Sequence, residues 1–153
     1  MKLNDTVRAD IEKSVLCWLA SVDPSGFPSV SPKEIWTVFD DTTLVVADIA
    51  SNNSVRNILK HPAVCLSFVD IFRQRGFKIQ GHADIIAPHD PDFARLGPGL
   101  AAMAGETFKI RHIIRIDVQR IARILAPSYR LDPDIDEDTM MKQAFATYGV
   151  RPA

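Results

Sequence analysis

A short polar run, Ser-Asn-Asn-Ser at residues 51–54, contains the side chains whose chemistry is easiest to interpret. Each of them can accept a hydrogen bond from a free backbone N–H, so each is a candidate N-cap for a helix over residues 55–60. Val55, Ile58 and Leu59 have helical spacing, and Pro62 ends the pattern. Such a helix start presents unpaired N–H groups and a partial positive charge, which together can bind a phosphate. The same residues also fit an ordinary capped helix that binds nothing.

The residues on either side of this helix predict an antiparallel sheet. Asp-Pro-Ser-Gly at residues 23–26 and Asp-Asp at residues 40–41 are turn sequences that separate runs rich in β-branched and apolar residues. Gly81 lies inside a later run, which is typical of a bulge or a close backbone approach where a sheet closes into a barrel. We expect strands at residues 17–22, 29–39 and 43–48, joined as an antiparallel meander, and at 63–70, 77–86 and 109–124, the last bent near Asp117.

Helices are expected at both ends of the chain. The N-terminal one should cover residues 4–15, with Asp5 or Thr6 as its cap and Val15 on its apolar face. The acidic run at residues 134–138 precedes a C-terminal helix, where negative charge is favourable for the helix dipole. No linker or repeat divides the sequence, so we expect one domain over residues 1–153, with further short helices at 92–96 and 100–104.

The composition is that of an ordinary globular domain, with 46% hydrophobic and 24% charged residues. A net charge of −1 gives no bulk electrostatic attraction to nucleic acid or to an anionic membrane. No run is long enough to span a bilayer, and the charged N-terminal sequence lacks the apolar core of a signal peptide, so we expect a cytoplasmic protein. Cys17 and Cys65 are expected to be reduced thiols, and the four histidines have no metal-ligand spacing.

Three stretches of the sequence resemble the pyridoxamine 5′-phosphate oxidase-like family of flavoproteins. They are GFPSVSPKEIW, LVVADIASNNSVRNILKHPAVCLSF and RGFKIQGHADI, and with the order of elements they extend the resemblance over residues 5–125. The resemblance implies a mainly β fold with flanking helices, namely an antiparallel split β-barrel of the FMN-binding type. It also implies a homodimer that binds FMN between its subunits and acts as an FMN-dependent oxidoreductase on a small-molecule redox substrate.

The resemblance places two strands beside the flavin ring. Ser31, Pro32 and Lys33 match the strand that runs along the ring, and Lys33 could supply positive charge near the part of the ring that becomes negative on reduction. Ala47 and Asp48 match a strand end that contacts the flavin. The same residues also fit an edge strand interrupted by proline, a solvated lysine and an Asx turn.

The phosphate site departs from the family pattern. Ser31 and Trp36 stand where pyridoxamine phosphate oxidases have an arginine and a lysine, and residues 52–54 replace a serine, arginine and lysine. The resemblance therefore implies a phosphate held by neutral donors, helix N–H groups and the charge of Lys33 or Arg56. Arg56 and its neighbour Asn57 point about 100° apart on a helix, so only one can face a ligand. The residues assigned to this site are Asn52, Asn53, Ser54, Arg56 and Asn57.

The turn that contains Arg73, Arg75 and Gly76 matches a family segment that approaches the flavin bound mainly by the other subunit, although two arginines in a turn also serve solubility alone. We expect the aromatic side chains Phe68, Phe72 and Phe77 to exceed what a small barrel interior can hold and to form a dimer interface.

No residue is identifiable as an acid–base catalyst. The missing family arginine and lysine leave the substrate side unspecified, so two other classes of function stay open. One is a non-catalytic module that binds a flavin or haem, and the other is a structural barrel without a small ligand.

Overall fold

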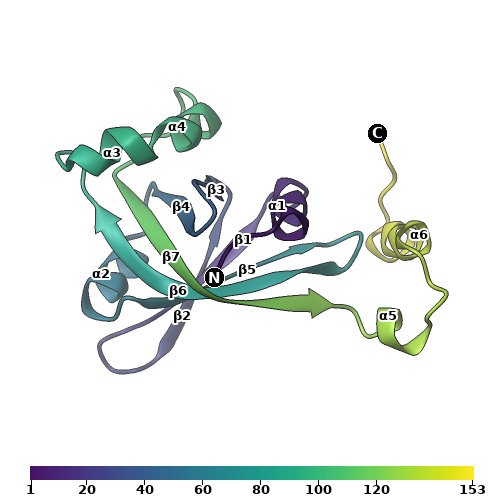
Figure 1. The fold of residues 1–153 in the computed structure, drawn as a ribbon. Helices are drawn as coiled ribbons and strands as arrows, with labels where there is room; N and C mark the ends of the chain where they lie inside the picture. The colour runs from purple at the N-terminus through teal and green to yellow at the C-terminus, as the bar shows by residue number, and fades with distance from the viewer.

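The computed structural model describes residues 1–153, and its centre is one curled antiparallel sheet of seven strands (Figure 1). The strand order across the sheet is β2-β1-β5-β6-β7-β4-β3, and the curl gives the split half-barrel expected from the sequence. The strands are β1 (Cys17–Val22), β2 (Pro28–Lys33), β3 (Trp36–Val38), β4 (Thr43–Asp48), β5 (Ala63–Asp70), β6 (Arg75–Ile86) and β7 (His112–Leu125).

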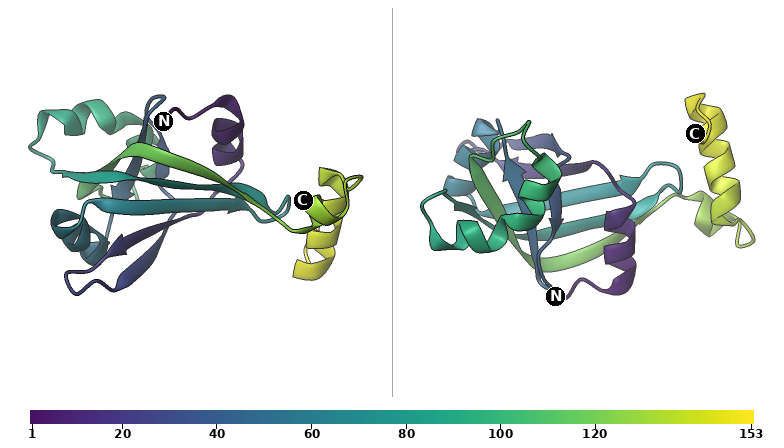
Figure 2. Two further views of the ribbon diagram at one scale, coloured as in Figure 1. Left: turned by 60° about the horizontal axis from the view of Figure 1, so that its bottom comes forward. Right: turned by 90° about the horizontal axis from the view of Figure 1, so that it is seen from above.

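Helices flank this sheet on several sides. In Figure 1, α3 and α4 lie at one end of the long strands, and α5 and α6 stand beyond the other end with the C-terminus. Both views of Figure 2 show the same separation of α5 and α6 from the barrel. No helix has both the length and the hydropathy needed to cross a membrane. The helices are α1 (Asp5–Glu12), α2 (Asn52–Lys60), α3 (Pro91–Leu96), α4 (Pro98–Ala104), α5 (Ser128–Leu131) and α6 (Glu137–Tyr148).

The expected three-strand meander is wrong, because the run at residues 29–39 forms two strands. Its first part, β2, pairs with β1, and its second part, β3, pairs with β4 at the opposite edge of the sheet. The chain bends between them at Glu34 and Ile35. A curled sheet brings its two edges together, so one continuous run can cross from one edge to the other.

The N-terminal helix is shorter than expected and has a different cap. Asn4 is the N-cap, and its side chain accepts a hydrogen bond of 3.0 Å from the backbone N–H of Val7. The helix ends at Glu12, so Val15 lies outside it and is exposed. Neither Asp5 nor Thr6 caps the helix, because both are already inside its first turn.

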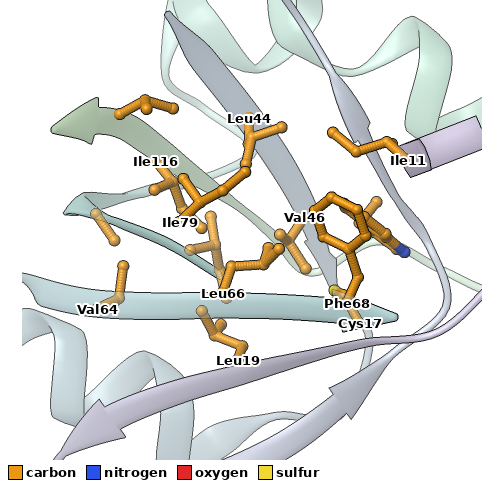
Figure 3. Packing of buried hydrophobic residues seen from close by; sticks show 14 of the residues in the cluster. Ile11, Cys17, Leu19, Leu44, Val46, Val64, Leu66, Phe68, Ile79 and Ile116 are labelled. Atoms are coloured by element: carbon orange, nitrogen blue, oxygen red, sulfur yellow. The ribbon is translucent and has the colours of Figure 1, made fainter. Parts of the chain in front are cut away.

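The main core fills the concave side of the curled sheet. Figure 3 shows side chains from β1, β4, β5, β6 and β7 converging there, together with Ile11 of α1. Phe68 and Phe77 are buried in this core, and the ring of Phe72 lies 4.9 Å from that of Phe145 on α6. The expectation that these phenylalanines form an apolar excess is therefore wrong. A smaller core of six buried residues lies under α3 and α4.

Two glycines of β6 allow close backbone contacts. The pairing of β6 with β7 shifts register between Gln80 and Gly81, which confirms the predicted irregularity at Gly81. A Cβ atom at Gly81 would overlap the carbonyl oxygen of Asp117, and one at Gly76 would overlap the carbonyl oxygen of Phe68. Both positions therefore require glycine for space rather than for an unusual φ angle.

Candidate functional site

The loop between β4 and α2 is organised by the carboxylate of Asp48, which is completely buried. Its Oδ1 accepts a hydrogen bond of 2.7 Å from the backbone N–H of Ser51. Its Oδ2 lies 2.8 Å from Nδ1 of His112, at the start of β7. The side chain of Asp48 thus accepts a hydrogen bond from a backbone N–H of the turn that follows β4. The carboxylate thereby fixes where α2 begins.

At the start of α2, several backbone N–H groups have no hydrogen-bond acceptor in the chain. The helix begins at Asn52, one turn earlier than expected, and Ser51 occupies the N-cap position without a side-chain capping bond. The first backbone bond of the helix runs from Val55 N–H to the carbonyl of Ser51, at 3.1 Å. The N–H groups of residues 52–54 thus have no intrahelical acceptor, and they carry the positive end of the helix dipole.

Strand β2 places two polar side chains beside these donors. The hydroxyl of Ser54 donates to that of Ser31 at 3.3 Å, and Nζ of Lys33 donates to Oγ of Ser51. Only 6% of the surface of Lys33 is exposed. Burial lowers the pKa of Lys33 below its usual value, and the nearby carboxylate of Asp48 partly offsets this effect. Pro32 lies between Ser31 and Lys33 on β2. This strand is at the edge of the sheet, which confirms the prediction of an edge strand interrupted by proline.

Arg56 and Asn57 are consecutive residues of α2, so their side chains point in different directions. Asn57 is buried, and its Nδ2 donates to Oγ of Ser21 on β1 at 3.0 Å. Arg56 lies on the solvent side, where its Nη2 donates to Oδ1 of Asn53 at 2.6 Å. Asn57 therefore attaches the helix to the sheet, and Arg56 contacts only its own helix.

A cleft of about 350 Å³ opens beside the start of α2. It contains three of the predicted site residues, from β2 and from the end of β4. A second cleft of about 520 Å³, lined by the end of β1, the start of β5 and the middle of β6 and β7, contains none of them. The lining of the first cleft is Leu16, Pro32, Lys33, Glu34, Ile35, Ala47, Ile49, Ala50, Ser51 and Phe108.

Arg75 and Gly76 are not part of this arrangement within one chain. The guanidinium of Arg75 contacts Oδ1 of Asp10 at 2.8 Å and also donates to Glu137 of α6. Arg73 pairs with Asp70 at 2.7 Å and with Glu137 at 3.1 Å. Figure 1 places this turn at the far end of the β5–β6 hairpin from α2.

Several residues that shape the cleft cannot be recognised from the sequence. The sequence predicts Ser51 as a possible cap, but its contact with Lys33 depends on how β2 meets the β4–α2 loop. Nothing in the sequence assigns a role to His112, although it bonds to Asp48, which is 64 positions away. Phe108 and Ile49 line the cleft without any local pattern that distinguishes them from other apolar residues.

Comparison with known proteins identifies the family. Residues 3–124 match the family model described as pyridoxamine 5′-phosphate oxidase. The chain belongs to this family. No protein of curated function matches it. The family match ends inside β7, so α5 and α6 lie beyond the part of the chain that is shared with the pyridoxamine 5′-phosphate oxidase family.

Solved structures of several proteins have the same fold. HupZ of Group A Streptococcus is 22% identical with a TM-score of 0.69, and the match covers 80% of this chain and 94% of HupZ. An FMN-binding protein of Syntrophomonas wolfei is 13% identical with a TM-score of 0.68, covering 81% and 87%. HutZ of Vibrio cholerae, described as a heme storage protein, is 15% identical with a TM-score of 0.63, covering 82% and 95%. Proteins of this fold thus include both FMN-binding and haem-storing examples.

Proposed function

We propose that this protein binds FMN between the two subunits of a homodimer and acts as an oxidoreductase on a small-molecule substrate. The observation that carries the proposal is the set of free N–H groups at the start of α2, which lie beside the buried Lys33 and the cleft between β2 and β4. The family match and the FMN-binding protein of similar fold support the same cofactor.

The residues present fit the two ends of FMN. Backbone N–H groups at a helix start, serine hydroxyls and a lysine ammonium are all donors, which suits a phosphate that only accepts hydrogen bonds. Ile35, Ala47, Ile49 and Phe108 give the adjacent cleft apolar walls, which suit a flat aromatic ring. Bound FMN would supply the redox-active ring, and the protein would bind, orient and shield it.

A spectroscopic experiment tests cofactor binding. The purified protein should show a flavin absorption band, or acquire one on titration with FMN, while tryptophan emission falls and the melting temperature rises. Trp36 is buried in the core next to β4, so its emission reports on the fold around the site. If saturating FMN changes neither emission nor melting temperature, FMN is not the cofactor.

A reduction experiment tests the catalytic part of the proposal. Anaerobic NADH or NADPH should bleach the bound flavin, and an electron acceptor should then restore its colour with turnover. A flavin that binds but is never reduced would instead identify a non-catalytic binding module.

A haem-binding module is the second candidate, and the larger cleft supports it. Its lining includes the imidazole of His82 and the thiol of Cys65, two side chains of the kinds that bind haem iron. Burial raises the pKa of Cys65, which keeps the thiol protonated at neutral pH and favours His82 as the ligand. A Soret band that appears on haem titration and is lost in His82→Ala would support this function.

A further inference from the structure

We propose that Lys33 is the cation that neutralises the cofactor phosphate, in place of the loop arginine and lysine that the family pattern has at residues 53 and 54. This inference rests on the proposed function, because it assigns a charge to the same phosphate site. It also applies to any phosphate monoester that binds at the start of α2.

Lys33 is buried and forms no salt bridge. Its ammonium has three N–H donors, but Oγ of Ser51 is its one hydrogen-bond acceptor in the chain. The buried carboxylate of Asp48 directs its oxygens at Ser51 and His112 instead. An unpaired buried charge is costly, so an anion that binds beside Lys33 would remove an existing penalty as well as form a new contact.

Lys33 also lies close to the start of α2. Its Nζ contacts the hydroxyl of Ser51, the residue immediately before the helix. From the same strand, Ser31 contacts Ser54 in the first turn. The side chains of β2 therefore lie on both sides of the free N–H groups of residues 52–54, and a phosphate bound to those N–H groups would lie within reach of the ammonium.

The competing cation, Arg56, lies farther from the cleft side of the helix. Arg56 is on the outer side of α2, and its guanidinium already contacts the side chain of Asn53. A phosphate held there would lie in solvent, where the charge of an arginine is screened. The ammonium of Lys33 is removed from solvent, so its interaction with a dianion is stronger.

The test compares FMN with riboflavin, which lacks the phosphate, by titration of Lys33→Met, Lys33→Arg and the wild type. Lys33→Met should lose roughly ten- to a hundredfold in FMN affinity, the effect of one charge-assisted hydrogen bond, and less than threefold in riboflavin affinity. Lys33→Arg should keep more FMN affinity than Lys33→Met. Lys60→Met is the matched control, because Lys60 is an exposed lysine in the last turn of α2, and it should change neither affinity.

Three outcomes would overturn the inference. They are an unchanged FMN affinity in Lys33→Met, an equal loss for FMN and riboflavin, and a larger phosphate-specific loss in Arg56→Met than in Lys33→Met. Circular dichroism of each variant verifies that it is folded before its titration is interpreted.

Inorganic phosphate separates this inference from the proposed function. If the wild type binds neither FMN nor riboflavin, the proposed function fails. A thermal-shift measurement with inorganic phosphate then tests whether Lys33 binds an anion, independently of any flavin. A phosphate-dependent rise in melting temperature that Lys33→Met lacks would support the anion site, whereas an equal response of the two proteins would overturn it.

Discussion

At the scale of single residues, Asp48 joins parts of the chain that are distant in sequence. Its carboxylate connects the end of β4 to the turn before α2 and to His112 at the start of β7. Both of its oxygens have hydrogen-bond partners inside the protein, so neither needs a donor from a ligand. The residue therefore positions the site without having to contact a ligand.

Lys33 should lower the stability of the unliganded protein. We expect Lys33→Met to raise the free energy of unfolding without ligand by on the order of 1 kcal/mol, since the methionine occupies a similar volume without a buried charge. Burial is the largest cause of the lowered pKa of Lys33, and the nearby charges of Asp48 and Cys17 offset it in part. Urea unfolding with and without FMN measures the effect, and a variant less stable than wild type in both conditions would contradict it.

The pH dependence of that stability follows from the same lowered pKa. An unfolded chain keeps the lysine proton up to a pH of about 10.4, whereas the folded protein releases it at lower pH. The unfolded state thus binds more protons between the two values, so wild-type stability rises with pH in this window. The stability gained by Lys33→Met over the wild type should therefore shrink as the pH rises through this window. A stability gain that grows with pH would show that the charge of Lys33 does not cause it.

Gly76 should not tolerate even one extra methyl group. A Cβ atom there would overlap the backbone of Phe68 and Val69 on the neighbouring strand, and backbone atoms cannot move aside as a side-chain end can. We expect Gly76→Ala to lower the free energy of unfolding by about 1–3 kcal/mol or more. Gly99→Ala is the control, since its Cβ would meet only a side-chain methyl group at 3.4 Å in a helix, where alanine is preferred.

At the scale of elements, Arg75 joins α1, β6 and α6 through charged contacts. Asp10 is 1% exposed, its Oδ2 has no hydrogen-bond partner, and its Oδ1 depends on Arg75. Arg75→Met should therefore cost about 3 kcal/mol of unfolding free energy, because it leaves a buried carboxylate unpaired. Glu137→Gln should cost less than about 1 kcal/mol, since 38% of the Glu137 side chain is exposed. A double variant Asp10→Leu/Arg75→Met that is as unstable as Arg75→Met alone would contradict this explanation.

The elements that local patterns specify were predicted well. Alternating and β-branched residues located β1, β4, β5, β6 and β7 to within a few residues, and Gly81 correctly marked an irregularity in β6. The acidic run before α6 also predicted its start, where Asp136 accepts a hydrogen bond of 2.7 Å from Thr139 N–H. In each case the cause is a preference of adjacent residues, which a sequence contains directly.

The features that were missed depend on contacts between distant residues. The division of residues 29–39 into β2 and β3 follows from closure of the sheet, which brings together strands that nothing in that run specifies. The contacts of Asp48 with His112 and of Arg75 with Glu137 join residues more than 60 positions apart. Asn4 was overlooked as the N-cap because Asp5 and Thr6 beside it are equally suitable by type.

At the scale of the whole molecule, the outer face of β1 and β2 is where we expect the dimer to form. Trp18 and Val30 are 46% and 55% exposed, and the pairing of Trp18 with Pro32 and of Ala20 with Val30 puts them on one face. Light scattering should give about twice the chain mass of 17.0 kDa. Trp18→Glu should reduce the mass to that of one chain, whereas Leu131→Glu, on α5, should not. A wild-type monomer at micromolar concentration would exclude a site shared between subunits.

The way α5 and α6 are attached divides the molecule into two parts that should open at different free energies. The hydrogen bonds, ion pairs and aromatic contacts that join these helices to the barrel all involve Phe72, Arg73 or Arg75, in or beside one turn. Amide hydrogens of α6 should therefore exchange with solvent through a local opening, while those of β5, β6 and β7 exchange only when the barrel unfolds. In native-state hydrogen exchange at increasing urea, the α6 amides should form a separate foldon of lower free energy, and Glu137→Gln should lower that free energy while leaving the barrel amides unchanged.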